Sequence, residues 1–159
     1  MIAALKVRES ALARAEEKQR LEWRHAFELT LQQSLPGVQI VGTSSNRLWN
    51  TVSALMPEAR DEWRVTSAET ESRHSAHSRW VVKLDKIGFA VSTGSACASG
   101  QEKPSHVLSA MGCTPAETGR VLRFSSGWET TPEDWNALAD ALGTVHQEMS
   151  EPRVAGCKL

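Results

Sequence analysis

A short β-prone run leads into a cysteine-bearing segment of small residues at Gly88-Phe-Ala-Val-Ser-Thr-Gly-Ser-Ala-Cys97-Ala-Ser-Gly100. Phe89 to Ser92 is predicted to be a buried strand, because its first residues are apolar and β-prone. The residues after it have almost no side-chain bulk, which is typical of a loop. A thiol on such a loop can reach outward, as a nucleophilic or carrier cysteine must. The alternative interpretation is that Cys97 is a small buried residue, the usual place of a free cysteine.

Two further segments follow in the chain, Pro104-Ser-His-Val-Leu-Ser-Ala-Met-Gly112 and Arg120-Val-Leu-Arg123-Phe-Ser-Ser-Gly127. In this order and spacing, the three segments resemble the C-terminal part of the cysteine desulfurases. These are pyridoxal-phosphate enzymes of the class V aminotransferase family. The resemblance extends more weakly through Leu48-Trp-Asn50-Thr51 and the long first helix, so it covers most of the chain.

The composition excludes several classes of protein. The chain has 159 residues, a net charge of −1 and a pI of about 6.5, so its charge does not favour nucleic acid or an acidic membrane. No apolar run approaches the roughly 20 residues of a membrane span, and charges appear too early for a secretory signal. Three cysteines, an odd number without close pairing, indicate a reducing compartment. We therefore predict a cytoplasmic protein of at most one ordinary domain.

Residues 2–34 are predicted to form one long helix, because glycine and proline are absent until Pro36-Gly37. Trp23, Phe27 and Leu31 recur at every fourth position and form its predicted buried face. The opposite face is predicted to be solvated and carries Glu16, Glu17, Lys18, Arg20, Glu22 and Arg24. In the resembled family, a long helix at this point joins a large cofactor domain to a small C-terminal domain.

The rest of the chain alternates short strands with helices. Strands are predicted at 38–41, 48–55, 89–92 and 121–125, and helices at 79–86, 105–111, 115–119 and from 132 onward. Periodicity alone does not separate helix from strand at 79–86; the resemblance makes it a helix. In the helix predicted at 105–111, the expected buried residues are Val107, Leu108 and Met111. In the helix from 132 onward, they are Trp135, Leu138, Leu142 and Val145 or Met149.

This alternation predicts an α/β (α+β) small domain with a few-stranded sheet covered by helices. The resemblance implies the C-terminal domain of fold-type I pyridoxal-phosphate enzymes. We divide the chain into a connecting helix at 1–35, a small domain at 36–150 and a tail at 151–159. Within the domain, 63–78 is predicted to be a loop insertion, because polar residues dominate it.

The resemblance assigns roles to individual residues. It makes Cys97 the catalytic nucleophile, which takes sulfur from the substrate and becomes a persulfide, and Arg123 the residue that binds the substrate carboxylate. A guanidinium suits that task because it forms bidentate pairs with carboxylates. The alternative for Arg123 is a structural ion pair, for which Arg120 is the better candidate. For His106, a role near Cys97 and a role in capping or packing at the helix start both stay possible. For Asn50, the two alternatives are ligand binding and local bonding to the backbone.

No metal site is predicted from the remaining histidines and cysteines. His74 and His77 lack a third ligand, and Cys113 and Cys157 lack metal-ligand spacing with Cys97.

Departures from the family pattern limit what this chain is expected to do alone. The family's cofactor lysine lies in a large domain, whereas Lys83 and Lys86 stand just before the strand that leads to Cys97. Trp128-Glu129 occupies the place where an arginine often stands. The cofactor of the complete enzyme is implied to be pyridoxal phosphate, and this chain is predicted not to hold it covalently and to be inactive when isolated.

The predicted function is therefore the C-terminal part of a cysteine desulfurase, a transferase that converts L-cysteine to L-alanine. The sulfur held on Cys97 would serve iron-sulfur cluster or thio-cofactor synthesis. The implied partners are a large cofactor-binding domain or chain and a sulfur-acceptor protein, with a dimer as the complete enzyme. The alternatives are a non-catalytic persulfide carrier or interaction module, and a truncated remnant without function.

Overall fold

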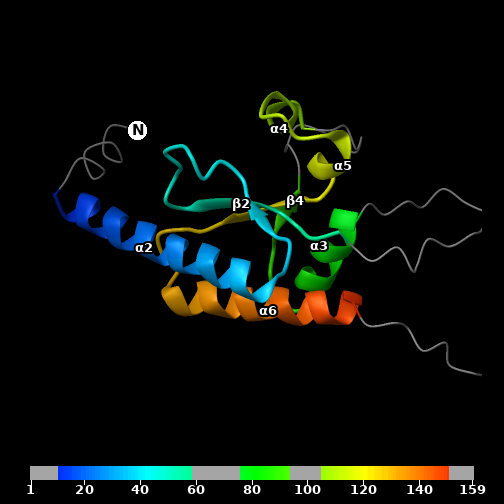
Figure 1. Cartoon of the computed structure of the whole chain (residues 1–159). Helices are drawn as coiled ribbons and strands as arrows, with labels where there is room; N and C mark the ends of the chain where they lie inside the picture. The colour runs from blue at the N-terminus through cyan, green and yellow to red at the C-terminus, as the bar shows by residue number, and fades with distance from the viewer. Residues whose placement is uncertain (1–10, 59–75, 94–104, 151–159) are drawn as a thin grey trace, which may run out of the picture.

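The computed structural model describes residues 11–58, 76–93 and 105–150. Its elements are α2 (Ala11–Ser34), β1 (Gln39–Ile40), β2 (Thr51–Leu55), α3 (Ala76–Lys86), β3 (Ser92–Thr93), α4 (His106–Ala110), α5 (Pro115–Thr118), β4 (Val121–Ser125) and α6 (Pro132–Ser150). The strands form one sheet in the order β1-β2-β4-β3, and every neighbouring pair is antiparallel. The long helices α2 and α6 lie side by side against one face of the sheet, and α4 and α5 lie beyond the other (Figure 1). The predicted mixture of helices with a small sheet is confirmed.

The main core lies between the sheet and the two long helices. Val52 and Ala54 of β2, with Leu122 and Phe124 of β4, point from the sheet into this core. Phe27 joins the layers, because its ring meets Phe124 edge-on at 5.7 Å and Trp135 at 4.5 Å between ring centroids. The buried faces predicted for α2 and α6 are confirmed, with Phe27, Leu31, Trp135, Leu138, Leu142 and Val145 buried and Trp23 and Met149 partly so.

Several predicted boundaries are wrong. The strand predicted at 89–92 is instead the two-residue β3, whose Ser92 is exposed, because Phe89 and Val91 pack on the edge of the core without strand pairing. α3 begins at Ala76, so the predicted loop at 63–78 is helical in its last residues. The strand predicted at 48–55 begins only at Thr51. Val107 and Met111 are each 54% exposed and not buried, because the five-residue α4 turns only Leu108 inward.

Predictions for 2–10, 59–75 (including His74), the segment around Cys97 and the tail at 151–159 lie outside the described residues. The backbone of His77 falls in α3.

Polar side chains cap the N-termini of α5 and α6, the two helices that flank β4. Thr114 accepts a hydrogen bond from Glu117 N at 3.3 Å, and Glu117 accepts one from Thr114 N at 2.7 Å, which together form a capping box. Thr131 and Asp134 repeat this exchange at the start of α6, at 3.3 and 2.8 Å. Before the first cap, Gly112 has a φ of +92°, a conformation that favours glycine, and it ends α4.

These caps predict a stability loss in acid. Hydrogen bonds from Thr114 lower the pKa of Glu117, and those from Thr131 lower the pKa of Asp134. The unfolded chain therefore binds protons at these carboxyls more readily, so their stabilisation is complete above the usual carboxyl pKa and is lost as pH falls through the lowered values. Urea denaturation at pH 6 and at pH 3 should show a smaller pH-dependent loss for E117Q and D134N than for the wild-type chain. An unchanged pH dependence in both variants would contradict this assignment.

Candidate functional site

One face of the sheet is not covered by the long helices. Side chains alternate along a strand, so the residues between the core positions of β2 and β4 point to this second face. At one end of it, Leu55 and Val121 pack against Leu108 of α4 and form a small second core. The rest of the face is polar and carries Thr51, Ser53, Ser92, Arg123 and Ser125. We call these five residues the open face.

Arg123 lies at the centre of the open face. It stands on β4 directly opposite Ser53 of β2 on one side and Ser92 of β3 on the other. Its side chain is half-buried, yet within the described part of the chain its guanidinium makes no hydrogen bond and no ion pair. Partly buried charges are normally paired, so an arginine without a partner among the described residues is a candidate for binding a negatively charged group.

Arg120 takes the structural role that was the alternative for Arg123. It donates to the carbonyl of Met56 at 3.1 Å and pairs with Glu58 at 3.3 Å, which ties β4 to the end of β2. The two arginines of this segment are therefore distinct, one engaged by the protein and one left free among the described residues.

The other predicted residues are placed as follows. The side chain of Asn50 bonds locally, because its Oδ1 accepts from the Thr51 hydroxyl at 3.2 Å; its backbone carbonyl accepts from Ser126 N of the neighbouring strand end at 2.9 Å. His106 is exposed at the start of α4, and the cap there is Ser105, whose hydroxyl accepts from Leu108 N. Cys97 lies outside the described residues, so its position relative to Arg123 stays a prediction.

The face of α2 predicted to be solvated is in part engaged. Glu28 is buried, and Arg47 donates from its two terminal nitrogens to both carboxylate oxygens of Glu28 at 2.7 and 2.9 Å. Arg24 Nε lies 3.4 Å from the same carboxylate, close enough for an ion pair but without a hydrogen bond. Arg24 also donates to the carbonyl of Leu48 at 2.6 Å. Burial lowers the pKa of Arg24, Glu28 raises it, and the nearby Arg47 charge lowers it.

Arg20, also predicted to be solvated, is held by three tryptophans. Its guanidinium lies 5.7, 5.2 and 4.9 Å from the ring centroids of Trp23, Trp49 and Trp128. It donates to the carbonyls of Gly127, Trp128 and Thr130. The hydrogen bonds to these carbonyls fasten α2 to the turn that follows β4. Sequence periodicity does not reveal them, because they join residues more than a hundred positions apart.

No protein-family model matches the chain. A cysteine desulfurase of Rhodobacter capsulatus is 33% identical over 116 residues, which cover 73% of this chain and 26% of that protein. Cysteine desulfurase IscS of Dictyoglomus turgidum is 33% identical over 128 residues, which cover 80% of this chain and 28% of that protein. This chain is homologous to the cysteine desulfurases.

The relatives are much longer than this chain, which spans about a quarter of the length of the two desulfurases described above. The fold agrees with the sequence relationship. A NifS-like protein from Rickettsia africae superposes with a TM-score of 0.60 at 23% identity, over 82% of this chain and 29% of that protein. The predicted resemblance to cysteine desulfurases is therefore confirmed. At 23% identity, the structural similarity itself shows only that the fold is shared.

The described lysines do not fit covalent binding of a cofactor at the open face. Lys83 of α3 pairs with Glu148 of α6, and Lys86 and Lys18 are exposed on α3 and α2. None of the three stands on the strands that form the open face. The described part of the chain thus offers an arginine for a carboxylate at this face but no amine for a carbonyl cofactor.

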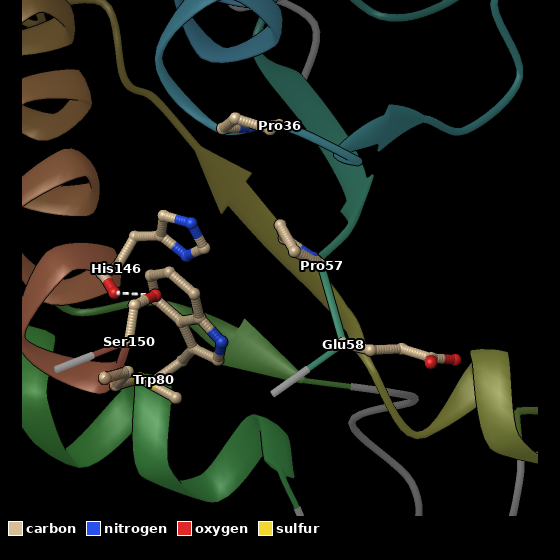
Figure 2. A pocket seen from close by; sticks show the side chains of 7 residues that line it. Pro36, Pro57, Glu58, Trp80, His146 and Ser150 are labelled. Atoms are coloured by element: carbon tan, nitrogen blue, oxygen red, sulfur yellow. Dashed lines mark hydrogen bonds between the residues drawn. The ribbon is translucent and has the colours of Figure 1, made fainter. Parts of the chain in front are cut away.

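A separate hollow of about 350 Å³ lies where the ends of α2, β2 and α6 meet α3 (Figure 2). Its lining residues are Pro36, Pro57, Glu58, Trp80, His146, Met149 and Ser150. The His146 ring stacks on Trp80 with centroids 6.2 Å apart, and the Ser150 hydroxyl donates to the His146 carbonyl at 2.8 Å. Glu58 is engaged by Arg120. Since Glu58 and the Ser150 hydroxyl already have protein partners, the open face is the stronger candidate site.

The described residues contain no group of three or more metal-ligating side chains. None of their helices is long and apolar enough to cross a membrane.

Proposed function

We propose that this chain is the C-terminal part of a cysteine desulfurase and provides the cysteine that takes sulfur from L-cysteine. The observation that carries the proposal is the half-buried Arg123, which has no partner among the described residues and stands on an uncovered sheet face. The homology supplies the class of reaction. The carboxylate of L-cysteine is the negative group that Arg123 would bind, through two parallel N–H···O bonds.

The chain connectivity supports a role for Cys97 at this face. β3 pairs with β4 through Ser92 and Arg123 and ends at Thr93, four residues before Cys97. An extended chain spans at most about 3.6 Å per residue, so the Cα atom of Cys97 lies within about 14 Å of that of Thr93. A thiol within that radius is in range of a substrate whose carboxylate Arg123 holds.

The proposed reaction needs no external oxidant. The bond between Cβ and the sulfur of L-cysteine breaks, and a bond forms between that sulfur and Sγ of Cys97. Cβ gains a proton and becomes the methyl group of L-alanine, while the transferred sulfur remains on Cys97 as a persulfide. The Cβ carbon of L-cysteine is reduced and its sulfur is oxidised, so the electrons balance between L-cysteine and the Cys97 thiol.

We infer that the cofactor of the complete enzyme is pyridoxal phosphate, held by a large domain or a separate chain corresponding to the part of the relatives not spanned here. In this proposal 1–35 connects to that part, 36–150 is the small domain, and 151–159 is a tail. A sulfur-acceptor protein, a dimeric complete enzyme and a cytoplasmic location belong to the same proposal.

Complementation tests the proposal. The N-terminal portion of the Rhodobacter capsulatus relative, ending where the match begins, would be purified with this chain, pyridoxal phosphate, L-cysteine and dithiothreitol. Sulfide and L-alanine should form with both chains together and with neither alone, because each lacks part of the site. Size-exclusion chromatography checks that the chains associate. Sulfide from this chain alone would contradict the assignment of the cofactor to another part, and an associated but inactive pair would favour a carrier or a remnant.

A further inference from the structure

We propose that Ser53 and Ser92 are binding residues for the same carboxylate that Arg123 takes, an inference that rests on the proposed function. Both serines are direct cross-strand neighbours of Arg123, one on each side. Cross-strand neighbours on one face have Cβ atoms about 5 Å apart, so the two hydroxyls flank the arginine side chain.

The chemistry of the flanking hydroxyls matches what a bound carboxylate still needs. A carboxylate has about four acceptor sites, and a bidentate guanidinium fills only two of them. Within the described residues, the hydroxyls of Ser53 and Ser92 make no hydrogen bond. Each is therefore free to donate to a carboxylate oxygen that Arg123 leaves open.

The size of these residues is a second argument. Strand positions favour β-branched and aromatic side chains, which would extend over the arginine. Serine on both sides leaves the space above Arg123 open, which is consistent with its half-buried side chain having no partner among the described residues. The open face is thus shaped for a small carboxylate, of the size of an amino acid.

A titration of this chain with sodium acetate, followed by amide chemical shifts, tests the inference. Saturable shifts are expected at 53, 92 and 123, and methylammonium chloride should give none. S53A/S92A should weaken acetate binding at least about tenfold, because two hydrogen bonds from hydroxyls to the charged carboxylate are lost. S34A is the matched control, since Ser34 is an exposed residue at the end of α2, which lies against the other face of the sheet, and it should bind as the wild type does. The dispersed spectrum of each variant shows that it is folded.

The outcomes separate the two proposals. If R123Q loses binding while S53A/S92A matches the wild type, the serine inference fails and the role of Arg123 stands. If the wild-type chain gives no saturable shift at these amides, the inference is overturned, and complementation still decides the proposed function. S53V/S92V should bind at least as weakly as the alanine variant, because valine removes the hydroxyls and also fills the space; binding restored by valine would overturn the inference.

Discussion

C97A is expected to lower sulfide release from L-cysteine by at least about a thousandfold in the complemented enzyme, because removing a nucleophile removes the covalent step entirely. The persulfide should disappear at the same time. Alkylation followed by mass spectrometry would show, in the wild-type chain only, a peptide containing Cys97 that is heavier by one sulfur atom. Substrate binding should be little changed, because Arg123 is retained.

C113A provides the matched control for this prediction. Cys113 is a free, half-buried cysteine that packs against the second core cluster of Leu55, Leu108 and Val121. Its replacement by alanine should cost stability but leave the persulfide on Cys97. Activity retained by C97A, or lost by a folded C113A, would show that the sulfur is carried elsewhere.

Local signals in the sequence were enough to predict most of the fold. Proline and glycine predicted the end of the first helix, and the four-residue spacing of Phe27 and Leu31 predicted its core face. Where the chain is short of such signals the prediction failed. Phe89 to Val91 looked like a buried strand, yet strand pairing depends on the partner strand, and β3 pairs only at Ser92 and Thr93.

The candidate site was only partly predictable for the same reason. Arg123 was predicted from its segment, but the serines on both sides of it, and its lack of a partner among the described residues, follow from strand pairing. The engagement of Arg24 also depends on Glu28 and on a loop residue, Arg47, far along the chain. Such tertiary contacts carry no periodicity in the sequence.

E28A is expected to lower the free energy of unfolding by about 3 kcal/mol, because it leaves two largely buried arginines without their carboxylate. Arg47 loses two hydrogen bonds, of 2.7 and 2.9 Å, and Arg24 loses its ion pair at 3.4 Å. The side chains of Arg24 and Arg47 are only 11% and 18% exposed, so water cannot fully replace the carboxylate. Urea denaturation followed by tryptophan fluorescence measures the loss.

E148A is the control for E28A, because it removes the carboxylate of an exposed ion pair instead of a buried one. Glu148 also pairs with a cation, Lys83, but it is 55% exposed, so its loss should cost less than about 1 kcal/mol. Replacing the whole cluster, as R24M/E28L/R47M, should recover much of the stability lost in E28A, since no buried charge is then left unpaired. Equal losses in E28A and E148A would mean that the Glu28 cluster is solvated, as the sequence pattern of α2 had predicted for Arg24.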